Sequence, residues 1–270
     1  MNLRDVVAAA LAEDLEPLGD ITAALLPPEV TAEAVIVPRT HGVLAGCAPA
    51  REAFFQVDAR VGVSWSAADG DTVLAGSPVA RVTGPLASIL TAERTALNFL
   101  GHLSGIATLT RRYVDLAAGG AVIRDTRKTT PGLRSLEKAA VRAGGGVNHR
   151  GNLSDGILVK DNHLAGVSIG EAVAGGRRTW PGRSIQVECD TLEQLEQALA
   201  ARADLVLLDN MAPAEVTKCV EAVAGRCLVE VSGGVTLDTV ATYAATGADL
   251  ISIGALTHSA PVLDIGLDLC

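Results

Sequence analysis

Residues 185–209 read IQVECDTLEQLEQALAARADLVLLD. Two short apolar runs at its ends flank a segment in which Leu192, Leu195 and Leu199 recur at helical spacing. Polar residues fill most positions between these leucines, so one side of the expected helix is apolar and the other faces water. The stretch therefore predicts a strand, a helix and a second strand in succession, which is the unit of a parallel sheet.

The same alternation extends outward from this stretch. Between equivalent apolar positions at Val187, Val206, Val229 and Ile251 the chain advances 19, 23 and 22 residues, enough each time for one helix and one strand. Apolar strands that alternate with helices predict parallel strands buried on both faces, in an open sheet or in a barrel. The expected strands are Ala121–Arg124, Ile157–Lys160, Ile185–Glu188, Leu205–Asp209, Leu228–Ser232 and Leu250–Ile253.

A polar or glycine-containing group lies at the carboxyl end of each expected strand. In a barrel of parallel strands these ends meet on one rim, where enzymes of this architecture place their active sites. An open dinucleotide-binding sheet would instead carry a G-x-G-x-x-G turn after its first strand, and this chain has none there. We therefore favour an α/β barrel. The groups are Asp125–Lys128, Lys160–Asn162, Glu188, Asp209–Asn210, Ser232–Gly234 and Gly254.

The first hundred residues have a different pattern. They begin with an amphipathic helix around Val6 and Leu11. Alternating, glycine-punctuated stretches at Ala34–Gly46 and Val61–Gly84 then predict a small antiparallel sheet. A long helical pattern follows at Thr91–Leu116. We expect a first α/β domain that ends near this helix and a barrel domain after it.

Charge is unevenly distributed along the chain. The formal net charge is -9, from 22 Lys and Arg against 31 Asp and Glu, and only 3% of the residues are aromatic. These values argue against binding of nucleic acid through phosphate contacts or base stacking. Residues 124–161, however, carry eight basic and four acidic side chains, so this segment is net +4 and the remainder -13. Such a local excess predicts a site for a small anionic ligand.

The five cysteines are widely spaced and form no C-x-x-C pair. They are typical of reduced thiols in a cytosolic protein. No apolar run approaches the length that spans a bilayer, and the first residues lack the pattern of a signal peptide. We expect a soluble, cytoplasmic protein with neither a membrane nor a nucleic acid as partner.

Four basic residues are candidates for binding the anion. Arg127 and Lys128 directly follow an expected strand, and Arg150 lies beside His149 in a glycine-rich loop that is also typical of a linker. Lys160 ends an apolar strand, where an ammonium is costly unless an anion pairs with it. A salt bridge from Lys160 to a neighbouring aspartate, Asp161 or Asp125, is the structural alternative to a role in binding.

Two carboxylates and two glycine-containing strand ends complete the candidate site. Glu188 and Asp209 end neighbouring strands and have the oxygen ligands that suit Mg²⁺ or sugar hydroxyls. Ser232–Gly234 and Gly254 can present backbone N–H groups to a phosphate, ahead of a helix expected to begin near Thr236. Arg94 is expected in the first turn of its helix, where a cation opposes the helix dipole. Either Glu93 neutralises it or it reaches toward an anion.

Six motifs together resemble the quinolinate phosphoribosyltransferase family. The resemblance covers nearly the whole chain, in order, and the motifs are long and specific. They are DTRKTTPGLR at Asp125–Arg134, GGGVNHR at Gly144–Arg150, GILVKDNH at Gly156–His163, LLDN at Leu207–Asn210, VSGG at Val231–Gly234 and GALTH at Gly254–His258.

The resemblance implies a fold of two domains. Residues 1–106, joined by the terminal segment 258–270, would form an α/β sandwich, and residues 107–257 an incomplete α/β barrel of seven strands. It further implies a transfer of the phosphoribosyl group from phosphoribosyl pyrophosphate to quinolinate, with Mg²⁺. The products would be nicotinate mononucleotide, CO2 and pyrophosphate, in NAD biosynthesis. A homodimer or a higher oligomer is expected.

The resemblance also implies roles for individual residues. Lys128, Glu188 and Asp209 would be catalytic, and Glu188 and Asp209 would also hold Mg²⁺. Quinolinate would bind to Thr126, Arg127, His149, Arg150 and Lys160, together with Arg94 from the partner subunit. Phosphoribosyl pyrophosphate would bind to Lys128, Glu188, Asp209, Ser232, Gly233, Gly234, Ile253, Gly254 and Ala255.

Three other functions remain open on the sequence. A nicotinate-specific or molybdenum-associated relative is one, although a substrate with one acid group needs fewer cations than this chain provides. A Schiff-base aldolase would use Lys160 as its nucleophile, as lysines at the ends of barrel strands often do. A non-catalytic protein that binds a phosphate-containing ligand is the third.

Overall fold

The computed structural model describes residues 2–270. The chain divides into two compact units. Unit 1 contains the residues up to Arg111 together with Thr129–Gly145 and Leu256–Cys270, and unit 2 contains Arg112–Lys128 and Gly146–Ala255. Both units combine helices with a sheet, which confirms the predicted α/β class.

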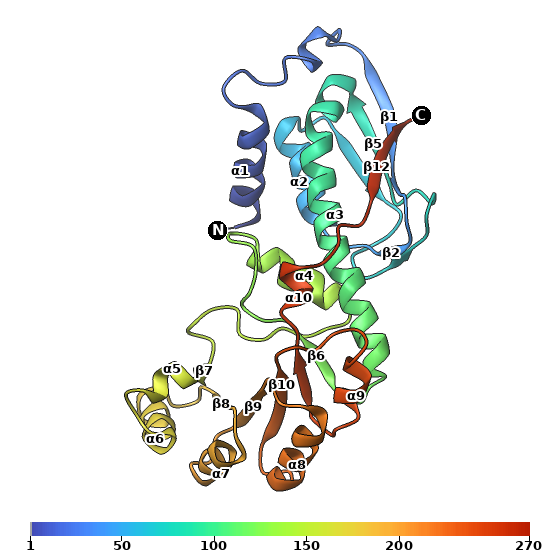
Figure 1. Ribbon diagram of the computed structural model, residues 1–270. Helices are drawn as coiled ribbons and strands as arrows, with labels where there is room; N and C mark the ends of the chain where they lie inside the picture. The colour runs from blue at the N-terminus through green and yellow to red at the C-terminus, as the bar shows by residue number, and fades with distance from the viewer. Residues whose placement is uncertain (1) are drawn as a thin grey trace. The chain divides into compact units, whose positions relative to one another are not determined.

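Unit 1 is built on a four-stranded antiparallel sheet in the order β12-β1-β5-β3 (Figure 1). This confirms the small antiparallel sheet predicted for the first hundred residues. The last strand of the chain lies beside the first, so the terminal segment belongs to this unit, as the resemblance implied. The strands are β1 (Thr31–Pro38), β3 (Gly62–Trp65), β5 (Ala80–Pro85) and β12 (Ile265–Leu269), with a separate pair β2 (Gly42–Val43) and β4 (Thr72–Val73).

Helices α1 (Leu3–Leu15), α2 (Cys47–Val57) and α3 (Leu86–Ala117) lie on one side of this sheet (Figure 1). Helix α1 begins with a capping box and buries Val6, Val7 and Leu11, the apolar positions that predicted it. Phe54 and Ile36 are fully buried in the core between the helices and the sheet. The remaining elements are α4 (Arg134–Ala143), α10 (Ala255–His258) and the short η1 (Ala23–Leu25).

Helix α3 is longer than predicted, and this corrects the interpretation of Arg94. The helix begins at Leu86, so Arg94 lies inside it and not in its first turn. Two glycines within the helix allow the C-terminal segment to pass close by. A side chain at Gly101 would meet Val262 and the backbone of Leu263, and one at Gly105 would meet the carbonyl of Pro261.

Unit 2 is built on a six-stranded parallel sheet in the order β6-β11-β10-β9-β8-β7. All six predicted strands are confirmed. The resemblance implied a seventh strand, and in its place Val147 forms a single parallel bridge to Arg124 beside β6. The strands are β6 (Val122–Arg124), β7 (Ile157–Val159), β8 (Ile185–Cys189), β9 (Leu205–Asp209), β10 (Leu228–Ser232) and β11 (Leu250–Ser252).

Helices cover the outer side of this sheet (Figure 1). The predicted helix after β8 is confirmed as α7 (Leu192–Ala200), which Thr191 caps through its hydroxyl. Among the described residues, none of the helices combines the length and the apolar character needed to cross a membrane. The other helices are α5 (Asp161–Leu164), α6 (Ile169–Thr179), α8 (Pro213–Val223) and α9 (Val240–Ala244).

The two faces of the parallel sheet differ in chemistry. Strand β8 is buried along its whole length, as predicted. Ile185 packs near Gly176 of α6, and because side chains alternate along a strand, Gln186 and Glu188 point to the opposite face. Strand β8 is thus buried on both faces, but its inner face carries polar side chains. By the register of the sheet, it also carries Arg124, Asp209, Glu230 and Ser252.

Candidate active site

A buried carboxylate lies at the centre of the inner face of unit 2. Glu230, on β10, has no exposed surface. Its Oε2 accepts hydrogen bonds from Arg124 Nη1 at 2.9 Å and from Gln186 Nε2 at 2.8 Å, and its Oε1 accepts from the Ser252 hydroxyl. A fully buried charge is stable only with such partners, so Glu230 joins strands β6, β8, β10 and β11.

A second buried carboxylate holds the glycine-rich loop against the end of β6. Asp125 has no exposed surface and accepts hydrogen bonds from Asn148 Nδ2 at 2.5 Å and from the backbone N–H of His149 at 2.8 Å. Arg124 Nη2 also donates to the carbonyl of Asn148. The loop that contains His149 and Arg150 is therefore anchored to the sheet and does not act as a linker.

His149 is enclosed by these groups. Its side chain is 11% exposed, and its Nε2 lies 3.2 Å from Gln186 Oε1 and 3.5 Å from Glu230 Oε1. Burial lowers the pKa of His149, and the nearby charges of Arg124 and Arg150 lower it further, against the opposing effect of Glu230. Burial, the largest of these effects, therefore favours the neutral form of the imidazole.

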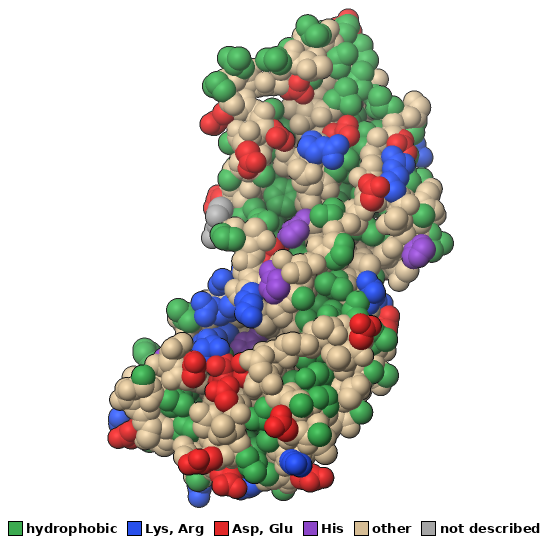
Figure 2. Space-filling view, viewed as in Figure 1, with side chains coloured by type: hydrophobic (Ala, Val, Ile, Leu, Met, Phe, Trp, Pro, Cys, Tyr) green, Lys and Arg blue, Asp and Glu red, His purple; other side chains and the backbone are tan. Residues whose placement is uncertain are grey.

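Arg150 and Arg127 repel each other. Burial lowers the pKa of the Arg150 guanidinium, and the positive charge of Arg127 lowers it further. Two guanidinium groups that raise each other's energy form a favourable site for a carboxylate, because an anion between them relieves the repulsion. Basic side chains gather in one region of the face shown in Figure 2, next to a group of acidic ones.

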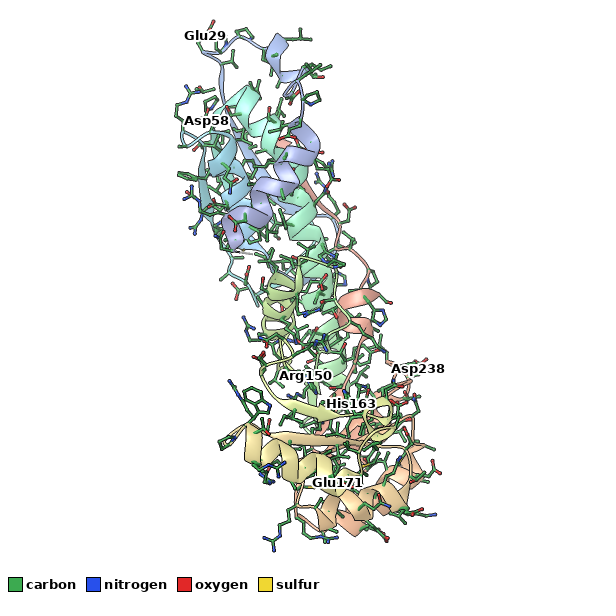
Figure 3. All side chains as sticks on the ribbon, turned by 90° about the vertical axis from the view of Figure 1, so that its left-hand side faces the viewer. Glu29, Asp58, Arg150, His163, Glu171 and Asp238 are labelled. Carbon is green, nitrogen blue, oxygen red and sulfur yellow. The ribbon has the colours of Figure 1, made fainter. Side chains whose placement is uncertain are left out.

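Lys160 pairs with a different carboxylate from those predicted. Its Nζ lies 2.5 Å from Oε2 of Glu188 on the neighbouring strand, so the salt bridge forms with neither of the alternative partners, Asp161 and Asp125. Lys160 and Glu188 lie side by side on neighbouring strands because Val159 of β7 pairs with Val187 of β8. The backbone N–H of Lys160 donates a hydrogen bond to Nδ1 of His163. This bond orients the turn into α5. Figure 3 labels Arg150 and His163 near one end of this unit and Glu171 of α6 farther away.

Two of the three predicted phosphate-binding glycines have the backbone geometry that only glycine adopts readily, and Gly254 does not. Gly233 and Gly234 have φ of 92° and 66°, and a side chain at Gly233 would overlap the amide of Asn210. The helix expected near Thr236 begins later, at Val240. The N–H of Ile253 donates to the carbonyl of Arg124 at 2.9 Å, so this amide is engaged in the backbone.

The remaining predicted residues occupy separate positions. Thr126 accepts a hydrogen bond from the N–H of Lys128 at 3.0 Å and so shapes the turn after β6, while Lys128 itself is exposed. Asp209 ends β9 and accepts from Asn210 Nδ2 at 2.6 Å. Arg94 is exposed on α3, in the part of the helix that belongs to unit 1.

Two family models match the chain. The quinolinate phosphoribosyl transferase N-terminal domain matches residues 20–104, and the C-terminal domain of the same family matches residues 106–268. The chain belongs to the quinolinate phosphoribosyltransferase family. The resemblance found in the sequence motifs is thereby confirmed.

Known proteins of this family are similar over nearly their whole length. The nicotinate-nucleotide pyrophosphorylase [carboxylating] of Mycobacterium leprae is 46% identical, over 98% of this chain and 96% of that protein. A probable enzyme of the same name from Bacillus subtilis is 44% identical, over 93% and 88%. The solved structure of the nicotinate-nucleotide pyrophosphorylase from Francisella tularensis is 38% identical, with a TM-score of 0.95 over 99% of this chain and 96% of that one.

Sequence reasoning on this family member missed the residues inside the strands. Gln186 and Glu230 lie inside β8 and β10, whereas the polar residues singled out in the sequence come at the carboxyl ends of the expected strands. The missed signal is an alternation of apolar and polar residues, clearest in IQVEC of β8 and LVEVS of β10. Such alternation indicates one apolar face and one polar face of a buried strand.

Proposed function

We propose that the chain transfers the phosphoribosyl group of phosphoribosyl pyrophosphate to quinolinate with loss of CO2, in NAD biosynthesis. The products are nicotinate mononucleotide, CO2 and pyrophosphate. Membership of the quinolinate phosphoribosyltransferase family supports this reaction. The observation that carries it is the repelling pair Arg127 and Arg150, a site suited to a carboxylate, in the same unit as Lys160.

Quinolinate has two adjacent carboxylates, and several cations can hold them. Arg127 and Arg150 bind one or both carboxylates through their guanidinium groups, and Lys160 adds a third charge. Thr126 and His149 line the pocket beside these cations. Arg94 of a second subunit supplies a further cation in a homodimer. A substrate with a single carboxylate, such as nicotinate, would leave part of this charge uncompensated.

The two strand-end carboxylates serve the phosphoribosyl side. Glu188 and Asp209 occupy neighbouring strands and share the inner face, where they can hold the ribose hydroxyls. Mg²⁺ fits this pair because it binds through one or two carboxylates and takes its other ligands from water and substrate phosphates. When bound, it neutralises the charge of the pyrophosphate. Lys128 lies at the exposed end of the turn after β6 and can neutralise the same group.

The remaining phosphate of the substrate binds at the ends of β10 and β11. Ser232, Gly233 and Gly234 can turn their N–H groups and the serine hydroxyl toward it, and a glycine backbone allows it to approach closely. Ile253, Gly254 and Ala255 line the next strand end. The N–H of Ile253 already donates to a backbone carbonyl, so Ile253 only shapes the phosphate site. The hydrogen bonds to the phosphate come from its neighbours Gly254 and Ala255.

The proposed reaction has two steps. As pyrophosphate leaves, positive charge develops at the anomeric carbon of the ribose, and the carboxylates of Glu188 and Asp209 stabilise it. The pyridine nitrogen then forms the new C–N bond. In the second step the C–C bond to one carboxylate breaks and CO2 leaves. Its electron pair stays on the ring carbon, beside the positively charged nitrogen, until a proton from water replaces it.

We also propose that the enzyme is cytoplasmic. The described cysteines are all free thiols. Burial raises the pKa of Cys189 to about 12, so this thiol is inert at neutral pH. Unpaired cysteines are compatible with a reducing compartment.

Pyrophosphate release tests the proposed reaction. The purified chain is supplied with phosphoribosyl pyrophosphate and Mg²⁺, with quinolinate, with nicotinate or with neither. We expect release with quinolinate and little with nicotinate. Release only with nicotinate would favour the nicotinate-specific relative, and no release would favour a binding protein. Borohydride trapping of a carbonyl substrate on Lys160 would favour an aldolase instead.

A further inference from the structure

A continuous chain of hydrogen bonds runs from the buried carboxylate of Glu230 to the backbone of Arg150. Gln186 Nε2 donates to Glu230 Oε2 at 2.8 Å, and Gln186 Oε1 lies 3.2 Å from His149 Nε2. His149 Nδ1 in turn accepts the backbone N–H of Arg150 at 2.7 Å. We call Glu230, Gln186 and His149 the buried chain. These three residues and Arg150 all lie in unit 2.

The chemistry of Glu230 sets the direction of every bond in the buried chain. An ionised carboxylate only accepts, so the amide nitrogen of Gln186 faces Glu230 and its carbonyl oxygen faces His149. An amide carbonyl also only accepts, so His149 must carry its proton on Nε2. The other ring nitrogen, Nδ1, then has the lone pair that the N–H of Arg150 requires.

The surroundings of Glu230 and His149 agree with these bond directions. Arg124 Nη1 donates to Glu230 at 2.9 Å and balances its charge. Burial lowers the pKa of His149, and a neutral ring is the form in which Nδ1 can accept a hydrogen bond. The hydrogen bonds of the buried chain are therefore mutually compatible.

We propose that Gln186 and Glu230 are positioning residues for quinolinate binding, acting through the tautomer of His149 on the backbone and guanidinium of Arg150. This inference rests on the proposed function, because it uses Arg150 as a ligand of quinolinate. Neither residue touches the substrate in this role. Without the chain, the His149 ring can turn and the Arg150 N–H loses its acceptor, so the backbone that carries the Arg150 side chain is less firmly placed. The guanidinium then depends on its hydrogen bond to the carbonyl of Gly156 at 3.2 Å.

Gln186→Met is the first test. Methionine has a similar length but cannot accept the proton of His149 Nε2. We expect the KM for quinolinate to rise about tenfold or more, the effect of losing one buried hydrogen bond, while the KM for phosphoribosyl pyrophosphate stays within about twofold. Equal increases in both KM values would overturn the proposal.

Val187→Ala is the matched control. Val187 is also fully buried on β8 but faces the helices, so its truncation weakens the same strand without reaching His149. We expect a lower melting temperature with no selective change in either KM. A quinolinate-selective increase in this variant would show that any weakening of β8 produces the effect, and would overturn the proposal.

An exchange of the two side chains tests the direction of the bonds. Gln186→Glu alone places two carboxylates side by side and should weaken quinolinate binding strongly. Combined with Glu230→Gln, the amide at position 230 donates to the carboxylate at position 186, which still accepts from His149. We expect the double variant to recover most of the affinity for quinolinate. A folded double variant no better than Gln186→Glu would overturn the proposal.

The tautomer of His149 can be measured without any activity. Nitrogen-15 NMR of the histidine-labelled chain, assigned with His149→Gln, should show a neutral ring protonated on Nε2 in the wild type. A ring protonated on Nδ1 would overturn the proposal. If the wild type released no pyrophosphate from quinolinate, the proposed function would fail, while this spectrum would still report on the buried chain.

Discussion

Lys160 and Glu188, on neighbouring strands of unit 2, form an ion pair with 2.5 Å between Nζ and Oε2. The lysine side chain is 42% exposed, whereas that of Glu188 is 9% exposed. The pair is therefore open on the side of the cation. An anionic substrate can approach Lys160 while Glu188 stays fixed beneath it, so the pair links the proposed quinolinate site to the proposed ribose site.

Glu188→Gln should reduce kcat strongly with little loss of stability. The substitution keeps the shape but removes the charge that would stabilise the anomeric carbon, for which we expect about a 100-fold decrease. Steady-state kinetics and a thermal melt measure both effects. Glu171→Gln, at an exposed helix position, is the control. An unchanged kcat would contradict the catalytic role of Glu188.

Arg150→Ala should weaken quinolinate more than phosphoribosyl pyrophosphate. Removing one charge-assisted hydrogen bond of about 1.5–3 kcal/mol predicts an increase of roughly 10- to 100-fold in the KM for quinolinate. Arg178→Ala removes an exposed arginine from α6 and serves as the control. Equal losses for the two substrates would count against the assignment of Arg150.

Gly233→Ala should impair binding of phosphoribosyl pyrophosphate. The residue has a φ of 92°, and its new side chain would push Asn210 out of place. We expect a loss of stability of about 1–3 kcal/mol and a larger KM for this substrate. Gly182→Ala imposes a similar backbone cost, at a φ of 86°, where nothing lies close. A similar KM effect in both variants would argue against a local role for Gly233.

Stability should fall as the pH drops below about 6.5, in part because of His149. Burial lowers the pKa of His149 in the folded state below its ordinary value of 6.5, so the unfolded state takes up the proton first. Each unit of lowering contributes up to about 1.4 kcal/mol, lost as the pH falls toward the folded pKa. Chemical denaturation of the wild type and of His149→Gln between pH 7.5 and about 5 gives the free energy of unfolding at each pH. The change of this free energy with pH should be smaller in His149→Gln. Identical slopes would refute it.

Much of the fold followed from local patterns. Apolar runs of strand length, spaced for one intervening helix, located every strand of the parallel sheet correctly, because burial of a strand requires such a run. The positions of the polar strand ends followed from the same pattern. Two helix starts differ from the predictions. Helix α3 begins before Thr91 and α9 begins after Thr236. No side chain caps the start of α9, so the sequence there has no clear start signal.

The amino-acid sequence by itself determined the class of fold, the family and the set of basic and acidic side chains near the strand ends. Only the tertiary structure decided which of these groups meet. Lys160 pairs with Glu188, and Glu230 reaches Arg124 and Gln186, although each pair is separated by many residues. These partners depend on the order and register of the parallel strands. Spacing along the chain cannot encode that arrangement, because it arises only when the strands pair side by side.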